Sequence, residues 1–304
     1  MQFMLEYPVA QTPYSVEFLE PEMLSAVAAI AERAGFTSIG FTDHPAPSEK
    51  WMRAGGHDSL DPFSALAFCA AATTKLRLTT YLLVAPYRNP LLIAKCAATV
   101  DVLSKGRLVL ALGAGYLRSE FAALGVDFAK RNQVLDEAVT AMTGIWSTDG
   151  YSYAGEHFVA IGQTARPRPI QRPIPIWFGG NSTRARERVA RCGQGWAPIL
   201  NSPTAAKTNR TALLDTPQKL ATAVEELHEL VLAEGRDPAR VDVQVETPQA
   251  GAWATEASLQ HHLDHVGTLK ALGVTSFVVK VPANDPRRAI DELERYGCDV
   301  IARC

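Results

Sequence analysis

Strand-like and helix-like segments alternate along almost the whole chain of 304 residues. This alternation is expected of a parallel sheet whose strands are joined by crossover helices. Eight such units predict a closed (β/α)₈ TIM barrel, an α/β fold, with residues 1–304 forming a single domain. The predicted strands are short and rich in β-branched or bulky apolar residues, and they cover residues 3–5, 38–42, 76–83, 107–112, 175–178, 195–199, 241–245 and 276–281.

Amphipathic stretches between these strands are predicted to form the outer ring of helices. Gly35 and Gly106 punctuate the first two helices at their carboxyl ends. The predicted helices cover residues 21–34, 90–104, 138–146, 183–191, 218–233, 256–272 and 287–296. Three stretches, 45–61, 151–161 and 201–217, do not fit the alternation, and we expect them on strand-to-helix loops around the active site. Residues 151–161 resemble a hairpin, and residues 201–217 are long enough to act as a lid.

Composition limits the partners of this chain. A hydrophobic fraction of 47% supports a sizeable core, and a net charge of −2 gives no overall attraction to nucleic acid or an anionic membrane. We therefore expect a small-molecule substrate. The five cysteines contain no C-x-x-C pair, the start shows no signal peptide, and no apolar run approaches the roughly 20 residues that span a bilayer. These features favour a cytoplasmic protein with reduced thiols.

Asp43 and His44 directly follow the second predicted strand. In a barrel, this places both side chains at the carboxyl ends of the strands, where reacting groups collect. A histidine there can shuttle a proton near neutral pH, and an adjacent aspartate can orient the site. The alternative is that His44 only caps a loop.

The run from Ile176 to Ser182 ends a strand and opens a helix through Gly179, Gly180 and Asn181. Small residues allow backbone N–H groups to approach a phosphate closely, although an ordinary tight turn with Ser182 as N-cap has the same pattern. Another turn, Gly113-Ala114-Gly115, fails as a dinucleotide-binding fingerprint because Arg118 stands where the third glycine belongs.

A metal site is not predicted. His261 and His265 stand four residues apart on one helical face, with Asp264 between them. A solvated polar face has the same spacing, and no distant third ligand is indicated.

Taken together, several short motifs resemble the luciferase-like monooxygenase superfamily. The similarity runs from about residue 20 to about residue 200, and its combined specificity is high. The motifs that carry it lie at residues 35–44, 61–63, 70–73, 76–80, 89–90, 103–107, 112–116 with Glu120, 173–180 and 193–196. The chain is most similar to the branch that depends on the deazaflavin coenzyme F420.

This resemblance implies a bacterial luciferase-like barrel with insertions and a cofactor, F420 or FMN, at the carboxyl ends of the strands. It implies that His44 lies beside the reactive ring carbon, that Asp43 touches the ring system, and that Tyr81-Leu82 is a non-proline cis peptide behind the ring. The sequence departs from the family at Thr79 and Tyr81, where the family usually has small residues. The implied cofactor-binding residues are Asp43, His44, Thr80, Tyr81, Leu82, Ser119, Gly179, Gly180, Asn181 and Ser182, and Glu120 matches the same ligand-facing loop as Ser119.

The leading hypothesis is an oxidoreductase that transfers a hydride between F420 and a small organic substrate, with His44 as the catalytic residue that donates or accepts the accompanying proton. The alternatives are an FMN-dependent monooxygenase, which uses reduced flavin and O₂, and a catalytically silent cofactor-binding barrel. Either enzyme could need a flavin or F420 reductase as the source of reduced cofactor. The family commonly forms homodimers, and the apolar helix over residues 90–102 is consistent with one. Arg166, Arg168 and Arg172 are candidates to contact an anionic cofactor tail, although solvated linker arginines are common.

Overall fold

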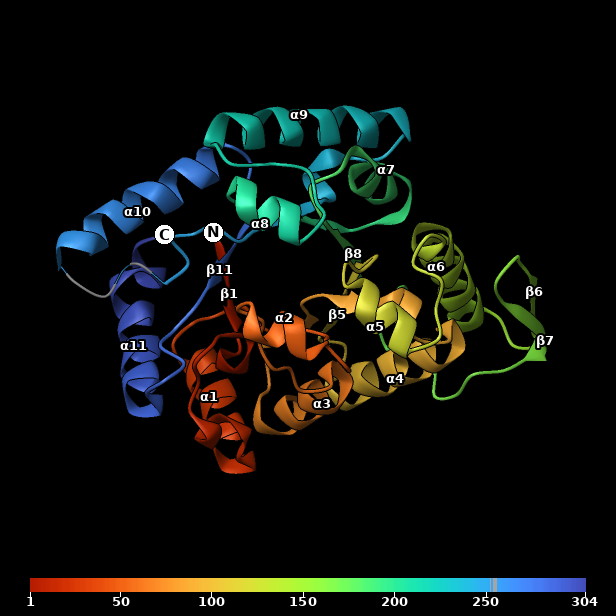
Figure 1. Ribbon diagram of the computed structural model, residues 1–304, viewed down its shortest axis with the longest axis horizontal. Coiled ribbons are helices and arrows are strands. Elements are labelled where there is room, and N and C mark those ends of the chain that lie inside the picture. The colour runs from red at the N-terminus through yellow and green to blue at the C-terminus, as the bar shows by residue number, and fades with distance from the viewer. Residues whose placement is uncertain (252, 254–255) are drawn as a thin grey trace.

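A closed parallel barrel forms the centre of the molecule. The computed structural model describes residues 1–251, 253 and 256–304. In these ranges the strands follow the order β3-β2-β1-β11-β10-β9-β8-β5-β4, and an additional pairing of β3 with β5 closes the sheet (Figure 1). Every pairing in this sheet is parallel, which confirms the predicted (β/α)₈ barrel. The barrel strands are β1 (Gln2–Glu6), β2 (Ser38–Phe41), β3 (Arg77–Thr80), β4 (Leu83–Val84), β5 (Leu108–Gly113), β8 (Ile176–Gly179), β9 (Gly195–Ala197), β10 (Asp242–Val245) and β11 (Ser276–Val279).

One predicted strand is interrupted. The expectation of a continuous strand over residues 76–83 is wrong, because the chain leaves the sheet between β3 and β4. The interruption contains the cis peptide bond Tyr81-Leu82, as the family resemblance implied. Beyond it, Leu83 pairs with Leu112 of β5. The third strand position of the barrel is therefore shared by two short strands, with a bulge between them at the carboxyl side.

The helices cover the outside of the barrel (Figure 1). Many of them begin where the sequence supplies proline at the first helical position after a capping side chain, as at Asp61-Pro62 and Asn89-Pro90. The α-helices are α1 (Pro21–Arg33), α2 (Glu49–Arg53), α3 (Pro62–Ala72), α4 (Pro90–Leu103), α5 (Arg118–Ala123), α6 (Arg131–Ser147), α7 (Thr183–Cys192), α8 (Pro203–Thr208), α9 (Pro217–Ala233), α10 (Glu256–Ala271) and α11 (Pro286–Asp299). Helix α6 begins at Arg131 rather than at residue 138, and α2, α3, α5 and α8 were not predicted. None of the helices in the described ranges is both long and apolar enough to cross a membrane.

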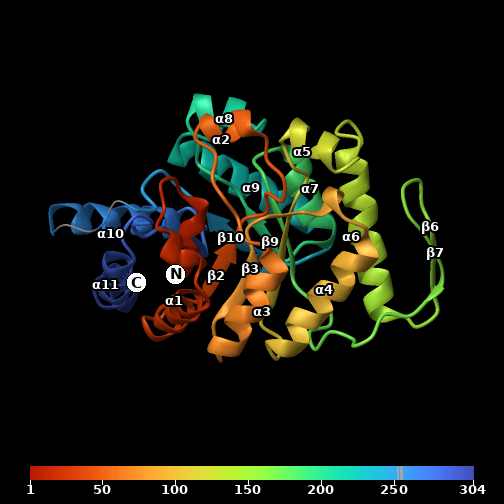
Figure 2. The same ribbon diagram turned by 60° about the horizontal axis from the view of Figure 1, so that its bottom comes forward.

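The insertions separate into two groups. Helices α2 and α8, which lie within residues 45–61 and 201–217, lie at the same end of the barrel as α5 (Figure 2). Residues 151–161 do form a hairpin, made of β6 (Tyr151–Ala154) and β7 (Val159–Gln163). However, this hairpin follows α6 and precedes β8, so it belongs to a helix-to-strand connection, and it projects beyond α6. Its expected place around the active site is wrong.

Candidate active site

His44 and Glu120 form the centre of a cavity at the carboxyl ends of the strands. His44 follows β2, and its Nδ1 lies 3.0 Å from Oε2 of Glu120, which α5 holds fully buried. The Glu120 carboxylate also accepts hydrogen bonds from the Tyr87 hydroxyl and the Ala46 backbone N–H. Burial alone would raise the pKa of Glu120, but these hydrogen bonds and the charge of His44 lower it below its ordinary value. An ionised Glu120 only accepts hydrogen bonds, so Nδ1 of His44 carries a proton and Nε2 faces the Tyr116 hydroxyl at 3.5 Å.

Aromatic side chains from separate loops enclose His44. The rings of Trp51, His57 and Tyr116 have centroids 4.7, 5.1 and 5.8 Å from that of His44. Trp51 lies on α2, so the 45–61 insertion folds back onto His44, which directly precedes it in the chain. Burial lowers the pKa of His57, whose Nδ1 lies 2.9 Å from the carbonyl oxygen of Asp58. Together these rings restrict the access of water to His44.

Asp43 is buried and ties the ends of two strands together. Its two carboxylate oxygens each accept a 2.7 Å hydrogen bond from the Arg88 guanidinium, and Oδ2 also accepts one from the Val84 backbone N–H. A bidentate pair of this kind fixes geometry as well as charge. Asp43 thus lines the cavity, while its carboxylate oxygens already accept hydrogen bonds from Arg88 and Val84. The contact of Asp43 with a cofactor ring stays a prediction.

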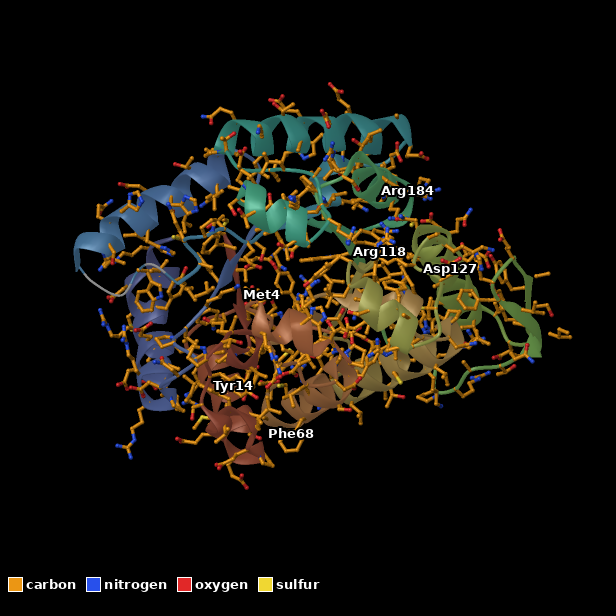
Figure 3. The ribbon with its side chains drawn as sticks, in the orientation of Figure 1. Met4, Tyr14, Phe68, Arg118, Asp127 and Arg184 are labelled. Atoms are coloured by element: carbon orange, nitrogen blue, oxygen red, sulfur yellow. The ribbon has the colours of Figure 1, made fainter. Side chains whose placement is uncertain are left out.

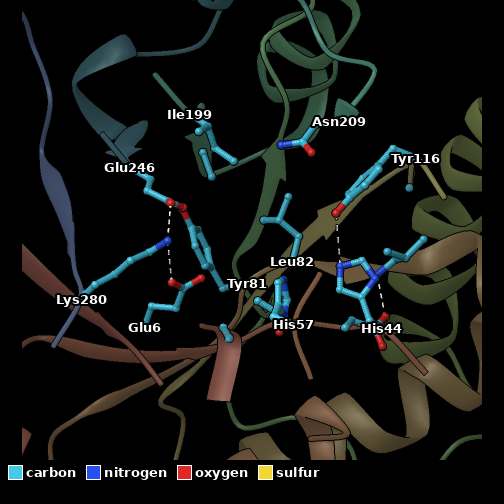
Figure 4. A pocket seen from close by; sticks show the side chains of 17 residues that line it. Glu6, His44, His57, Tyr81, Leu82, Tyr116, Ile199, Asn209, Glu246 and Lys280 are labelled. Atoms are coloured by element: carbon cyan, nitrogen blue, oxygen red, sulfur yellow. Dashed lines mark hydrogen bonds and ion pairs between the residues drawn. The ribbon is translucent and has the colours of Figure 1, made fainter. Parts of the chain in front are cut away.

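A second polar group lines the opposite wall of the cavity (Figure 4). Lys280 Nζ lies 3.0 Å from Oε2 of Glu6 and 2.6 Å from Oε1 of Glu246, whose other oxygen accepts a hydrogen bond from the Tyr81 hydroxyl. Burial, reinforced by the charge of Glu246, raises the pKa of Glu6 to about 7 against the opposing effect of Lys280. We call Glu6, Tyr81, Glu246 and Lys280 the lysine cluster. It places a carboxyl group that can exchange a proton near neutral pH beside the cavity.

Leu82 stands between the two walls and is packed against glycines (Figure 4). A Cβ atom at Gly113 would lie 3.4 Å from Cδ1 of Leu82, and a Cβ atom at Gly179 would overlap the same side chain. The missing side chain of Gly179 therefore makes room for the bulge that carries the cis peptide. The cavity itself has a volume of about 250 Å³.

The turn after β8 is partly committed to internal contacts. The side chain of Asn181 is buried and bonds both the N–H and the C=O of Ile199, and its backbone N–H donates to Thr211 Oγ1. Ser182 caps α7. Gly180 has a φ of +102° and no atom within 4 Å of where its Cβ would stand. The turn therefore leaves open space at Gly180 and the first amides of α7 for an anion.

Residues 1–268 match the family model described as luciferase-like monooxygenase. The chain belongs to the luciferase-like monooxygenase family. Proteins similar to it include enzymes with two kinds of cofactor. An F420-dependent glucose-6-phosphate dehydrogenase of Segniliparus rotundus is 30% identical over 240 residues, covering 76% of this chain and 65% of its own length. An FMNH(2)-dependent dimethylsulfone monooxygenase of Pseudomonas putida is 33% identical over 177 residues, covering 56% and 46%.

A solved structure agrees with this affiliation at the level of the fold. The monooxygenase RslO1 of Streptomyces bottropensis superimposes on this luciferase-like chain with a TM-score of 0.78 and 19% identity, covering 100% of this chain and 99% of its own. The family contains oxidoreductases that use F420 and oxidoreductases that use reduced FMN.

The predicted site residues of this luciferase-like barrel fall into three sets. Asp43, His44, Tyr81 and Leu82 all line the cavity, together with Glu6, His57, Tyr116, Glu246 and Lys280. Thr80 is fully buried and donates to the carbonyl of Ala111, and Ser119 is exposed on α5. Residues 179–182 lie beyond Leu82 at the start of α7.

Sequence reasoning named Tyr81 but missed the three charged members of the lysine cluster, and it also missed His57. Glu6 ends β1, while Glu246 and Lys280 follow β10 and β11, so each stands at the carboxyl end of a strand. That shared position was the available signal, because such ends converge in a barrel.

The two remaining sequence expectations concern the linker arginines and a metal site. Arg168 and Arg172 line a groove with Trp146 on the amino side of β8, and Arg166 and Arg168 pair with Asp149. Their suggested contact with a cofactor tail is therefore wrong, because the connection into β8 enters the barrel at the opposite end from the cavity. Among the described residues, no three His, Cys, Asp or Glu side chains are grouped as a metal site requires.

A methyl group at Gly179 tests the packing behind Leu82. We expect Gly179→Ala to push the Leu82 side chain into the cavity and to weaken cofactor binding roughly tenfold, since a shift of 1.4 kcal/mol is a factor of ten. Fluorescence titrations with F420 and with FMN, the two candidate cofactors, measure the change in affinity. Gly267→Ala, on α10, is the matched control because its Cβ would meet no atom within 4 Å. Unchanged affinity of Gly179→Ala would contradict the role of this glycine.

Proposed function

We propose that this chain is an oxidoreductase that binds the deazaflavin coenzyme F420 and uses it to reduce or oxidise a small organic substrate. The observation that carries the proposal is the His44–Glu120 pair at the cavity, with Nδ1 of the imidazole held by a buried carboxylate and Nε2 directed toward Tyr116. A histidine fixed in this way holds or moves a proton at one defined atom.

The residues at the site fit a planar ring with an anionic tail. The bulge at Tyr81-Leu82 sits against Gly113 and Gly179, and open space follows at Gly180 where α7 begins. The bound deazaflavin would supply a two-electron hydride donor or acceptor. The choice of F420 over FMN is supported by the extent of the two matches. The F420-dependent glucose-6-phosphate dehydrogenase matches 76% of this chain, whereas the FMNH(2)-dependent monooxygenase matches 56% of it.

The side chains on the two walls of the cavity have different roles: one wall positions the proton-transfer group, and the other binds the substrate. On one wall, Glu120 orients His44, and the ring of Trp51 excludes water from it. Burial raises the pKa of Tyr116 to about 12, so its hydroxyl keeps its proton and is available as a donor. On the other wall, Lys280 and its carboxylates offer charged partners for a polar group of the substrate.

Parallel titrations with F420 and FMN, followed by fluorescence, test the cofactor. We expect micromolar affinity for F420 and weak binding of FMN. Tight binding of FMN alone would overturn the proposal in favour of an FMN-dependent monooxygenase, and binding of neither would favour a catalytically silent barrel.

The second candidate function is the FMN-dependent monooxygenase itself. The relative from Pseudomonas putida favours it, since it has the higher identity over the matched segment. That enzyme would consume O₂ and depend on a reductase for reduced FMN, while an F420 enzyme could use an F420 reductase in the same way. Oxygen uptake in a closed cell distinguishes the two: turnover at an equal rate without oxygen excludes the monooxygenase.

We also propose that the chain forms a homodimer through α3 and α4. Leu92 is 65% exposed and Phe68 44% exposed on these helices, and a groove of about 740 Å³ between them has a mostly apolar lining. Contiguous apolar surface of this kind marks association sites. We expect Leu92→Asp to sediment as a monomer at concentrations where the wild type is a dimer. Leu232→Asp on α9, which is 61% exposed, is the control. A wild type that sediments as a monomer would contradict the proposal.

A further inference from the structure

Three arginines from separate segments surround one aromatic ring at the edge of the site. The guanidinium carbons of Arg131, Arg118 and Arg210 lie 3.9, 4.7 and 5.8 Å from the ring centroid of Phe128. Arg118 begins α5, Arg131 begins α6, and Arg210 follows α8. The consecutive helices α5 and α6 and the distant residue after α8 thus bring their cations to the half-buried Phe128.

The positive charge of this group is poorly compensated. In the ranges that the structure describes, no carboxylate lies within ion-pair distance of Arg118, Arg131 or Arg210. Burial, followed by the charges of Arg118, Arg210 and Arg184, lowers the pKa of Arg131. Like charges this close repel one another, so the arrangement costs stability unless an anion joins it.

Arg184 adds a fourth cation from α7. Its ion pair with Asp136, at 3.3 Å, is shared, because the same carboxylate also pairs with Arg188 and Arg191. Asp127, next to Phe128, is exposed and accepts a hydrogen bond from the Ala129 backbone N–H. Of the four arginines, Arg184 thus has an ion pair among the described residues, and it shares that carboxylate with two other arginines (Arg118 and Arg184 are labelled in Figure 3).

The arginines continue directly from the cavity. Arg118 stands two residues after Tyr116, and Arg210 follows Asn209, and both Tyr116 and Asn209 line the cavity. Arg184 lies in the first turn of α7, four residues after Gly180. An elongated ligand seated in the cavity would pass the first turn of α7 and reach the arginines with its far end.

We propose that Arg118, Arg131, Arg184 and Arg210 bind a chain of carboxylates that extends beyond the phosphate of a cofactor seated in the cavity. This inference rests on the proposed function, since F420 carries glutamate residues beyond its phosphate, whereas FMN ends at its phosphate. Guanidinium groups suit the role because they bind carboxylates through two parallel hydrogen bonds and stay charged at any physiological pH. The site selects between the two cofactors by the length of the anionic tail.

The test compares F420 that carries several glutamates with the same deazaflavin phosphate that lacks them. We expect the wild type to bind the tailed form roughly tenfold more tightly at low ionic strength, and added salt to reduce that preference. The double variant Arg118→Gln/Arg210→Gln removes two unpaired cations. We expect it to lose most of the preference, while its affinity for the tailless form changes less than about twofold. Fluorescence titration reads both affinities without turnover.

A matched variant controls for net charge. Arg33→Gln/Arg287→Gln removes two exposed arginines on α1 and α11, and we expect it to keep the preference of the wild type. Equal affinity of the wild type for both deazaflavin forms would overturn the inference and leave the proposed cofactor intact. Binding of FMN but of neither deazaflavin form would overturn both. The wild-type comparison alone decides the question if the double variant does not fold.

Discussion

Turnover is expected to fall by about 10²- to 10⁴-fold when His44 is replaced with Ala, the range that a positioned acid or base typically contributes. His44 lines the cavity with one ring nitrogen available for proton transfer, and its other ring nitrogen is held 3.0 Å from the Glu120 carboxylate. The change is measured by F420 fluorescence in single-turnover and steady-state experiments with a substrate found by screening.

The control for this variant is His261→Ala, because His261 is exposed on α10. It should leave turnover unchanged. A Glu120→Gln variant separates proton transfer from positioning, because it retains His44 and removes only the charge of its partner. We expect an intermediate loss of about tenfold. Unchanged turnover in His44→Ala would support the catalytically silent barrel instead.

The free energy of unfolding is expected to fall by about 3 kcal/mol when Lys280 is replaced with Met, the lower end of the cost of breaking a buried ion pair. The lower end applies because the Lys280 side chain is 26% exposed, whereas that of Glu6 is 5% exposed. Without the ammonium group, two carboxylates face each other across the cavity wall. Urea denaturation at pH 7 measures the loss, and the double variant Lys280→Met/Glu6→Gln should recover most of it.

The pH dependence of this loss is a sharper test. The pKa of Glu6 is about 7 in the folded chain and 4.5 ordinarily, so the folded state binds more protons between these values. The stability contributed by Glu6 is therefore fully present below pH 4.5 and is lost as the pH rises through 7. Removal of Lys280 makes ionisation of Glu6 costlier still, so the deficit of Lys280→Met should be larger at pH 8 than at pH 5. An equal deficit at both would contradict electrostatic coupling in the lysine cluster.

The features of this fold that could be predicted are those that depend on residues close together in the sequence. The alternation of strands and helices, the helix start at Asn89-Pro90, and the position of His44 after β2 are encoded in neighbouring residues. Propensity, capping and the direction of parallel strands act over a few residues, so the barrel and its reactive end could be predicted. The cis peptide Tyr81-Leu82 was accessible through family resemblance rather than through any local rule.

Tertiary structure alone decided which groups meet. Glu120 binds His44 from 76 residues away, and Glu6, Glu246 and Lys280 come together only when β11 pairs with both β1 and β10. No local pattern records that Arg118, Arg131 and Arg210 converge on Phe128. The sequence by itself determined that a barrel forms and which end of it carries the chemistry. Barrel closure decided which charged and titratable side chains meet at that end and hence their pKa values. Electrostatic interactions depend on distances in space, and the spacing of residues along the chain does not specify these distances.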